Sequence, residues 1–269
     1  MNCRSAALLH NSRFRRETPS RLAFERLGSV PGEPLFIADW ERALMIHYEV
    51  EPHVLQSQVP FKLDLMEGRA FISAVAFTMR GMRPRLGGKI AGWLLKPIST
   101  HEFLNVRTYV RHRNEPGIYF LAEWLSNRMS TLLGPGLFGL PYRYAELNYN
   151  HCCETGVLKG KVLVRDHSIG FEYHASIASR TEAAFMQCEE GSLEEWLMER
   201  YTAFTKLHGS ALFFRVWHTP WMQTAARIRI TDQSLLNEHW PFLKEAQLTG
   251  ANFCASLRDV WMGWPHRLR

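Results

Sequence analysis

Apolar and polar side chains alternate in short runs along most of this chain, with the two-residue period of half-buried strands. In residues 69–80, for example, Phe71, Val75 and Phe77 alternate with smaller residues. This pattern predicts strands over residues 40–50, 69–80, 103–112, 117–122, 140–150, 157–165, 168–177, 212–218 and 226–230. The last dozen residues show no clear period.

Helical periodicity is confined to a few segments. In residues 192–208, Ser192 and Glu195 have capping-box spacing, and an apolar stripe interrupted by Arg200 runs to Gly209. We therefore predict a helix there, packed outside the sheet. A second helix is predicted over residues 123–133, with Gly134 as its stop, and Asp232 is suited to cap a third.

Two segments read as connections. Residues 82–97 contain three glycines, two prolines and several basic residues, a composition typical of a mobile loop, and in a compact domain such a loop often acts as a lid. Residues 114–117, with a Pro-Gly step, predict a tight hairpin turn between two strands.

About ten short strands without regular strand-helix alternation predict a mainly β fold with a few peripheral helices, arranged as an antiparallel barrel or rolled sheet. A chain of 269 residues is compatible with one such domain, which we assign to residues 30–269. Residues 1–29 are interpreted as a flexible basic extension.

The net charge of +6 is concentrated at the chain ends. Residues 1–29 carry +4 and residues 258–269 carry +2, so residues 30–257 are balanced and we expect no nucleic-acid partner. No apolar run is long enough to cross a bilayer, and we expect no membrane partner. Five cysteines without regular spacing fit a reducing compartment, which favours a cytoplasmic location.

Motif searches identify no cofactor and no metal site. Residues 134–139 match a dinucleotide fingerprint formally, but a predicted helix precedes them and a strand follows, the reverse of the required order, so we interpret them as a loop. In His151-Cys152-Cys153, adjacent side chains on a strand point to opposite faces, which favours a packing role.

Several segments, in a fixed order over about two thirds of the chain, resemble the uncharacterised YqjF-like family. They are Asp64-Leu-Met-Glu-Gly-Arg-Ala-Phe71, Leu104-Asn-Val-Arg-Thr-Tyr-Val110, Gly117-Ile-Tyr-Phe120, Leu140-Pro-Tyr142, Glu199-Arg-Tyr201 and His218-Thr-Pro-Trp221. That family is similar in fold to acetoacetate decarboxylases. The resemblance implies a closed or cone-like, mostly antiparallel sheet around a pocket.

The resemblance also implies a missing catalytic group. The decarboxylases carry a Gly-Phe-Pro-Lys-Lys segment whose lysine forms a Schiff base with a β-keto acid. The matching segment here is Gly139-Leu-Pro-Tyr142-Arg143, and a phenol cannot form an imine. Many family members also have a glutamate directly before Leu-Asn-Val-Arg, where this chain has Phe103, with Glu102 on the opposite strand face. Schiff-base decarboxylation is therefore not expected.

Strand alternation places Asn105, Arg107 and Tyr109 on one face, which we expect to line the pocket. Tyr142 matches the pocket lysine of the decarboxylases. We therefore expect its strand face, which also carries Tyr144 and Glu146, to point into the pocket. These six residues are the predicted ligand-binding set. Alternatively, Arg107 is a structural arginine neutralised by Glu146 or Glu199, because buried charges are usually paired. For residues 199–201 and 218–221, packing and turn geometry are favoured over catalysis.

Two function classes follow. One is a small-molecule-binding protein or non-imine enzyme, in which Arg107 holds the carboxylate of a small ligand. The other is a non-catalytic structural or protein-interaction module whose interior is filled by its own side chains. A clear pocket favours the first class and a solid interior the second.

Overall fold

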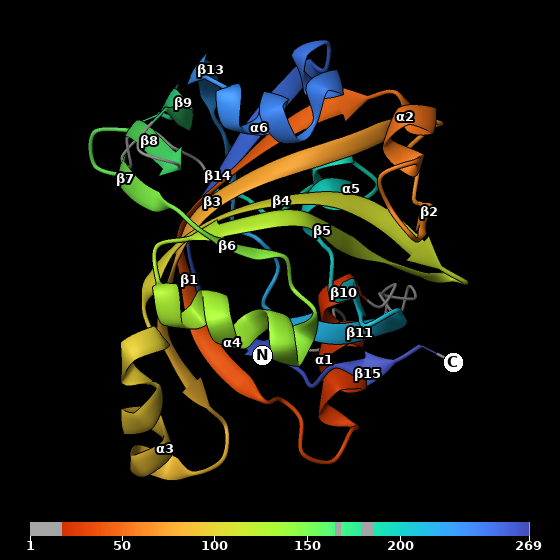
Figure 1. Ribbon diagram of the computed structural model, residues 1–269, viewed down its shortest axis with the longest axis vertical. Helices are drawn as coiled ribbons and strands as arrows, with labels where there is room; N and C mark the ends of the chain where they lie inside the picture. The colour runs from red at the N-terminus through yellow and green to blue at the C-terminus, as the bar shows by residue number, and fades with distance from the viewer. Residues whose placement is uncertain (1–17, 165–167, 179–184, 269) are drawn as a thin grey trace, which may run out of the picture.

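The fold is built around one large sheet of long, curved strands (Figure 1). The computed structural model describes residues 18–164, 168–178 and 185–268, apart from the side chain of Lys89. The sheet consists of β1 (Phe36–Val50), β2 (Lys62–Leu63), β3 (Ala70–Pro84), β4 (His101–His112), β5 (Glu115–Leu125), β6 (Tyr142–Tyr144), β10 (Thr202–Leu207), β11 (Ser210–Trp217), β12 (Thr224–Ala225), β14 (Gln247–Met262) and β15 (His266–Arg267).

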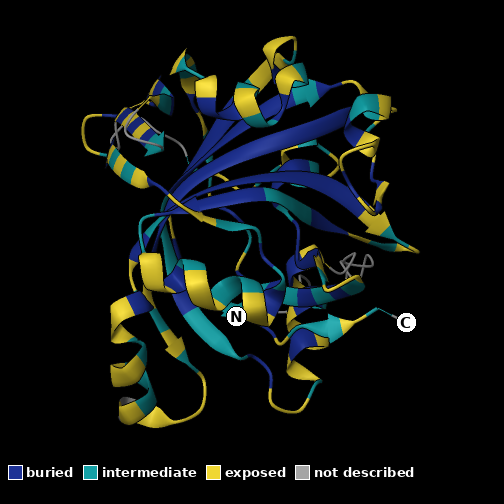
Figure 2. Cartoon of the chain, viewed as in Figure 1, coloured by how far each residue is buried: buried dark blue, intermediate teal, exposed yellow. Residues whose placement is uncertain are grey.

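The central strands are joined in a ring of hydrogen bonds. The order is β14-β1-β3-β4-β5-β10-β11, and β11 pairs back to β14 at Val216 and Trp217. All pairs are antiparallel except those of β5 with β10 and with β6. Figure 2 shows that the middles of these strands are buried. The predicted mainly β, closed and mostly antiparallel sheet is thus confirmed, as a mixed ring rather than a regular barrel.

A second, four-stranded sheet and several short helices surround the ring. The sheet has the order β13 (Arg227–Asp232), β9 (Ile169–Ser176), β8 (Val157–Val164) and β7 (Glu146–Cys152). The helices are α1 (Pro19–Gly28), α2 (Pro52–Gln56), α3 (Gly88–Leu95), η1 (Lys96–Ile98), α4 (Arg128–Phe138), α5 (Leu193–Met198), α6 (Ser234–His239) and η2 (Pro241–Lys244). Within the described residues, no helix is long and apolar enough to span a bilayer.

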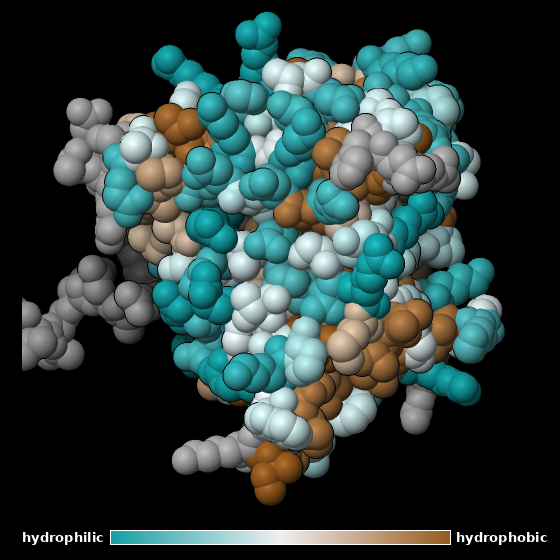
Figure 3. Space-filling view, turned by 60° about the vertical axis from the view of Figure 1, so that its left-hand side comes forward, coloured by the Kyte–Doolittle hydropathy of each residue, from teal (hydrophilic) through white to brown (hydrophobic). Residues whose placement is uncertain are grey.

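The segment expected to be a lid loop contains ordered structure. Residues 82–84 continue β3, and residues 88–98 form α3 and η1. The helix is apolar along its length, and Figure 3 shows an apolar area on the lower part of the surface where α3 lies. Its glycines permit the turn that starts the helix, because Gly87 and Gly88 both have positive φ.

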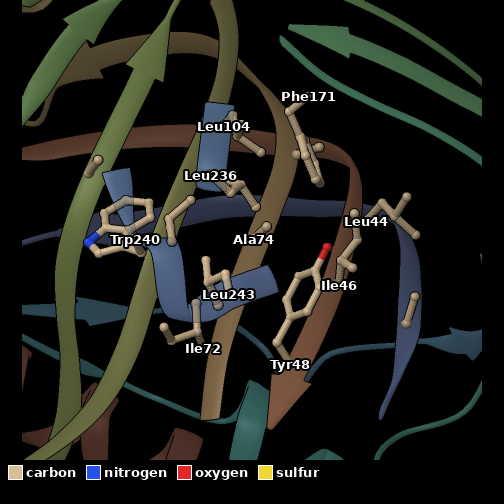
Figure 4. Close-up of a cluster of buried hydrophobic side chains, with 14 of the residues drawn as sticks. Leu44, Ile46, Tyr48, Ile72, Ala74, Leu104, Phe171, Leu236, Trp240 and Leu243 are labelled. Carbon is tan, nitrogen blue, oxygen red and sulfur yellow. The ribbon is translucent and has the colours of Figure 1, made fainter. Parts of the chain in front are cut away.

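Alternation along the long strands divides the apolar side chains between two faces. On the outer face, residues such as Ile46, Ala74 and Leu104 pack against α6, η2 and the second sheet (Figure 4). On the inner face, Met45, Val75, Phe77 and Phe103 are among the residues directed into the ring. Full burial of such side chains contributes about 1.5–3 kcal/mol each to folding.

The predicted helix over residues 192–208 is wrong in its second half. Ser192 caps α5 as expected, accepting a hydrogen bond from the Glu195 N–H, but the helix ends at Met198. Residues 202–207 instead form β10, which pairs with β5 and β11. The apolar spacing of this segment fits either period, and pairing with β5 and β11 decided between them.

The predicted helix over residues 123–133 is displaced. Glu123 to Leu125 belong to β5, and α4 begins after Asn127, whose side chain accepts a hydrogen bond from the Ser130 N–H. The helix then continues through Gly134 and ends at Gly139, which has positive φ, so residues 134–138 are helical and not a loop.

Three further boundaries differ from the sequence prediction. The hairpin turn lies at Arg113–Asn114, because Pro116 already pairs with Arg111 in β5. The long strand β14, of sixteen residues, was not predicted. The helix α1 packs on the ring with Ala23 and Leu27 buried, so part of the basic amino-terminal segment belongs to the folded structure, whereas residues 1–17 lie outside the described residues.

Candidate functional site

The ring encloses a cavity of about 400 Å³. Its wall is mostly apolar and comes from the inner faces of β1, β3, β4, β5 and β11 and from α3, η1 and α4. Among its polar lining residues are His101, Asn105, Arg107, Glu123 and Arg200. The interior is therefore not filled by the protein's own side chains.

Arg107 lies on β4 with its side chain in the cavity wall, 6% exposed. Its Nη2 donates to the carbonyl oxygen of Leu197 at 3.2 Å and contacts the sulfur of Met45 at 3.6 Å. No other hydrogen bond of its guanidinium is found among the described residues, and the buried Nε has no partner. Neither Glu146 nor Glu199 forms an ion pair with Arg107, so the structural alternative of a neutralised arginine does not hold within the described part of the chain.

Glu123 faces the same cavity from β5, where it pairs in register with Asn105 on β4. It is 4% exposed, and its Oε2 has no hydrogen-bond partner in the described structure. Burial raises the pKa of Glu123 to about 8, although the charge of Arg107 acts in the opposite direction. The carboxyl group is therefore largely protonated at neutral pH and can donate a hydrogen bond.

Asn105 completes a wall of buried polar groups without partners. Its Oδ1 is buried and makes no hydrogen bond with the described residues. Asn105, Arg107 and Glu123 thus leave donors and acceptors unsatisfied at one place in an apolar cavity. Buried polar groups are nearly always hydrogen-bonded, because each unsatisfied group costs about 1–3 kcal/mol. Such a cluster is typical of a site that a ligand or water completes.

Tyr142, at the position of the decarboxylase lysine, also lines the cavity. Its ring lies against Gly134 of α4, where a Cβ atom would come within 2.2 Å of the ring. Burial raises its pKa well above the usual value for a phenol, and the neighbouring Glu123 acts in the same direction. Among the described side chains, no lysine lines the cavity.

The other predicted site residues lie elsewhere. Tyr109 is buried behind the cavity wall, with its hydroxyl 2.5 Å from the Ser73 Oγ and its ring against Trp196. Tyr144 and Glu146 are exposed and lie outside the cavity. The expectation that they share an inward face with Tyr142 is wrong. Glu146 begins β7 of the second sheet, and Tyr144, at the end of β6, packs its exposed ring against the exposed Arg128 guanidinium.

Arg200 is the second buried arginine of the cavity, and it is paired. Its Nη1 lies 2.7 Å from the Asp64 Oδ2, and Arg111 holds the other oxygen of Asp64 at 2.8 Å. Its guanidinium also packs over the ring of Trp196. Arg200 therefore has the neutralising partner that Arg107 lacks.

The Glu199 and His218–Trp221 motifs pack together, and His218 and Trp221 form part of the cavity wall. Glu199 accepts hydrogen bonds from the Trp221 backbone N–H and the Tyr201 hydroxyl. The Trp221 indole N–H donates to the Met198 carbonyl oxygen at 3.0 Å. These contacts fix the end of α5, where the Leu197 carbonyl oxygen accepts the hydrogen bond from Arg107 Nη2. The two motifs therefore support the site through packing.

Sequence reasoning missed Glu123 and His101. Glu123 stands inside the apolar run Leu121-Ala-Glu-Trp-Leu125, and a lone acid in such a run is a signal of a buried, functional carboxyl group. The misplaced helix over residues 123–133 hid it. His101 faces the cavity, and burial lowers its pKa to about 4, so the ring is neutral at physiological pH.

The fold is that of acetoacetate-decarboxylase-like enzymes. The protein is similar to an acetoacetate decarboxylase-like enzyme from Sphingomonas wittichii RW1, with a TM-score of 0.60 and 15% identity over 88% of this chain and 94% of the other. It is also similar to the enduracididine biosynthesis enzyme MppR complexed with pyruvate, with a TM-score of 0.61 and 11% identity over 90% and 93% of the two chains. At these identities the likeness shows the fold alone.

The family is shown by sequence. Residues 37–248 match the DUF2071 family, described as an uncharacterised conserved protein, and the chain belongs to this family. It is 30% identical to the uncharacterised protein YqjF of Bacillus subtilis (strain 168) over 209 residues, which cover 77% of this chain and 82% of the relative.

Proposed function

We propose that the cavity binds a small molecule with a carboxylate group, and that Arg107 is the anchor for that group. The observation that carries this proposal is a buried guanidinium without an acidic partner among the described residues. A guanidinium presents five donors in a planar fork, and a carboxylate accepts two of them side by side. The pyruvate complex of the structurally similar MppR gives further support.

The shape of the cavity suggests that the ligand also has an apolar body. His101, near the α3 end of the cavity, and Arg107 are six positions apart on β4, which corresponds to roughly 20 Å at 3.3 Å per residue. The wall between them is built mainly of apolar residues such as Met79, Phe77 and Phe103. A ligand with its carboxylate at Arg107 and an apolar chain toward α3 would cover this wall.

Glu123 favours a second candidate, a proton-transfer enzyme that acts on the same ligands. A carboxyl group whose pKa is raised to about 8 by burial can exchange a proton near neutral pH. Asn105, its neighbour across the strand pair, is suited to orient a second polar group of the ligand. Chemistry through a protein Schiff base is not part of this proposal, because Tyr142 replaces the lysine.

Thermal-shift measurements with carboxylic acids of increasing chain length, together with pyruvate, test the proposal. A ligand at 100 times its Kd stabilises the fold by roughly 2.7 kcal/mol. We expect carboxylates with apolar chains to raise Tm, and the corresponding primary amides to have little effect. The Arg107→Lys variant should lose this response, since lysine keeps the charge but not the bidentate geometry.

The matched control is Arg80→Lys, an exposed arginine on β3 that pairs with Glu41 away from the cavity. This variant should respond to carboxylates like the wild type. If no carboxylate shifts Tm, or if the Arg107→Lys protein responds as well as the wild type, the proposed anchor is wrong.

A further inference from the structure

An apolar patch is formed by α3 and α4, which are joined through η1: the side chain of Asn127, the N-cap of α4, donates a 2.7 Å hydrogen bond to the Pro97 carbonyl oxygen of η1, which follows α3. The α3–α4 patch consists of Leu86, Ile90, Trp93, Leu94, Met129, Leu132, Leu133 and Leu137. The most exposed of these side chains are Leu132 at 81%, Ile90 at 77% and Trp93 at 71%. Figure 3 shows apolar surface gathered at this end of the molecule. Contiguous exposed apolar surface of this kind marks an interaction site.

The charged residues on the two segments that form the α3–α4 patch are all basic. Residues 79–101 and 124–145 contain seven arginines and lysines and no acidic residue. Two of these, Arg80 and Arg83, are paired with acids of β1 and β14. Arg85, Lys96 and Arg128 are exposed and form no ion pair within the described residues. The patch therefore carries a positive rim.

The cavity opens within the α3–α4 patch. Leu133 and Leu137 line the cavity, yet they are 57% and 41% exposed. Leu95 of α3 and Ile98 of η1 also line the cavity. A molecule that leaves the cavity at this end therefore meets an apolar surface, and not water alone.

We propose that the α3–α4 patch docks on an anionic lipid surface. Helices with leucine, isoleucine and tryptophan on one side and basic residues at the edge insert into the boundary between headgroups and acyl chains. Each basic residue near an anionic leaflet strengthens binding. The sequence expectation of no membrane partner rested on the lack of a spanning segment, and peripheral docking requires none.

A second copy of the chain fits this surface less well. A symmetric contact would bring the basic rim of one copy against the same rim of the other, and like charges in an interface are unfavourable. It would also close the mouth of the cavity from both sides. A bilayer instead offers negative headgroups to the rim and acyl chains to the mouth. Docking there does not depend on the role of Arg107.

Co-sedimentation with vesicles tests the proposal. The full chain is mixed with vesicles of phosphatidylcholine alone or of phosphatidylcholine and phosphatidylglycerol in equal amounts. We expect binding to the anionic vesicles, at least about tenfold weaker binding to the neutral ones, and weaker binding at high salt. The double variant Trp93→Ser/Leu94→Ser should bind the anionic vesicles at least about tenfold more weakly.

Matched controls separate the patch from general surface effects. Leu65→Ser removes an exposed leucine that is 42% accessible and lies outside the patch, so it should bind vesicles like the wild type. Lys96→Glu should lose the preference for anionic vesicles, whereas Lys159→Glu, an exposed lysine on β8, should keep it.

Failure of the wild-type chain to bind anionic vesicles would overturn the proposal, as would equal binding by the Trp93→Ser/Leu94→Ser variant. Sedimentation in the absence of lipid distinguishes a second copy of the chain from lipid as the occupant of the patch. A concentration-dependent dimer that the double variant abolishes would identify a second copy as the occupant of the patch, and would also overturn docking on lipid.

Discussion

Arg107 and Glu123 face one cavity from the neighbouring strands β4 and β5, and no ion pair joins them. Desolvation raises the pKa of Glu123, and the positive charge of Arg107 lowers it. The effect of desolvation is the larger, so the pKa rises to about 8. An arginine that is charged and a carboxyl group that is mostly neutral therefore share the cavity at physiological pH. This arrangement leaves the positive charge available to an anionic ligand, because the nearby acid does not neutralise it.

The first prediction concerns stability as a function of pH. The pKa of Glu123 in the folded state lies above its unfolded value, so its stabilising contribution is complete below about pH 4.5 and is lost as the pH rises through about 8. At 1.4 kcal/mol per pKa unit, this loss amounts to about 4–5 kcal/mol. Glu123→Gln should remove it, so we expect the variant to exceed the wild type in unfolding free energy above pH 8.

Urea unfolding of both proteins between pH 5 and pH 9 measures this difference in unfolding free energy. Glu245→Gln is the control for the loss of an exposed acid outside the cavity. Parallel profiles for the wild type and Glu123→Gln would show that Glu123 titrates normally.

The second prediction compares the two buried arginines. Arg200→Met leaves Asp64 with Arg111 alone, and we expect the unfolding free energy to fall by about 3 kcal/mol, as for other broken buried pairs. Arg107→Met removes an unpaired buried charge at the expense of one hydrogen bond to Leu197. Its unfolding free energy should equal that of the wild type or exceed it. Equal losses in both variants, measured by denaturant unfolding, would contradict an unpaired Arg107.

The third prediction tests the packing that holds Tyr142. A Cβ atom at Gly134 would lie 2.2 Å from the Tyr142 ring, so Gly134→Ala should force the ring to move and cost about 1–3 kcal/mol. Gly136 lies in the same helix with open space around it. Gly136→Ala should stabilise the protein by about 0.5–1 kcal/mol, because alanine favours the helix over glycine. If Tyr142 did not occupy this position, thermal unfolding would show a change in Tm of the same sign for both variants.

The fourth prediction concerns covalent chemistry. Borohydride treatment in the presence of acetoacetate or pyruvate should leave no adduct on the protein, because Tyr142 stands at the Schiff-base position and no described lysine side chain lines the cavity. Mass spectrometry of the intact chain checks this outcome. A stoichiometric adduct mapped to a lysine would mean that the imine chemistry of the fold is retained through another residue.

The sequence by itself determined the strand content and one face of the site. Strict alternation in β4 directed Asn105 and Arg107 to the same side, and that side lines the cavity. The family segments and the replacement of lysine by Tyr142 were equally visible. These features are local, because the period of a strand fixes which residues share a face wherever the strand is placed.

Only the tertiary structure decided what surrounds those residues. Residues 202–207 became a strand because β5 and β11 offered hydrogen-bond partners, although their apolar spacing also fits a helix. Glu146 lies outside the cavity because the chain passes from one sheet to the other between Tyr144 and Glu146. Glu123 acquired its raised pKa from burial beside β4, and Arg107 kept its charge unpaired because Glu199 was taken up by Trp221 and Tyr201. Burial and pairing arise from contacts between residues far apart in the chain, and no local pattern encodes them.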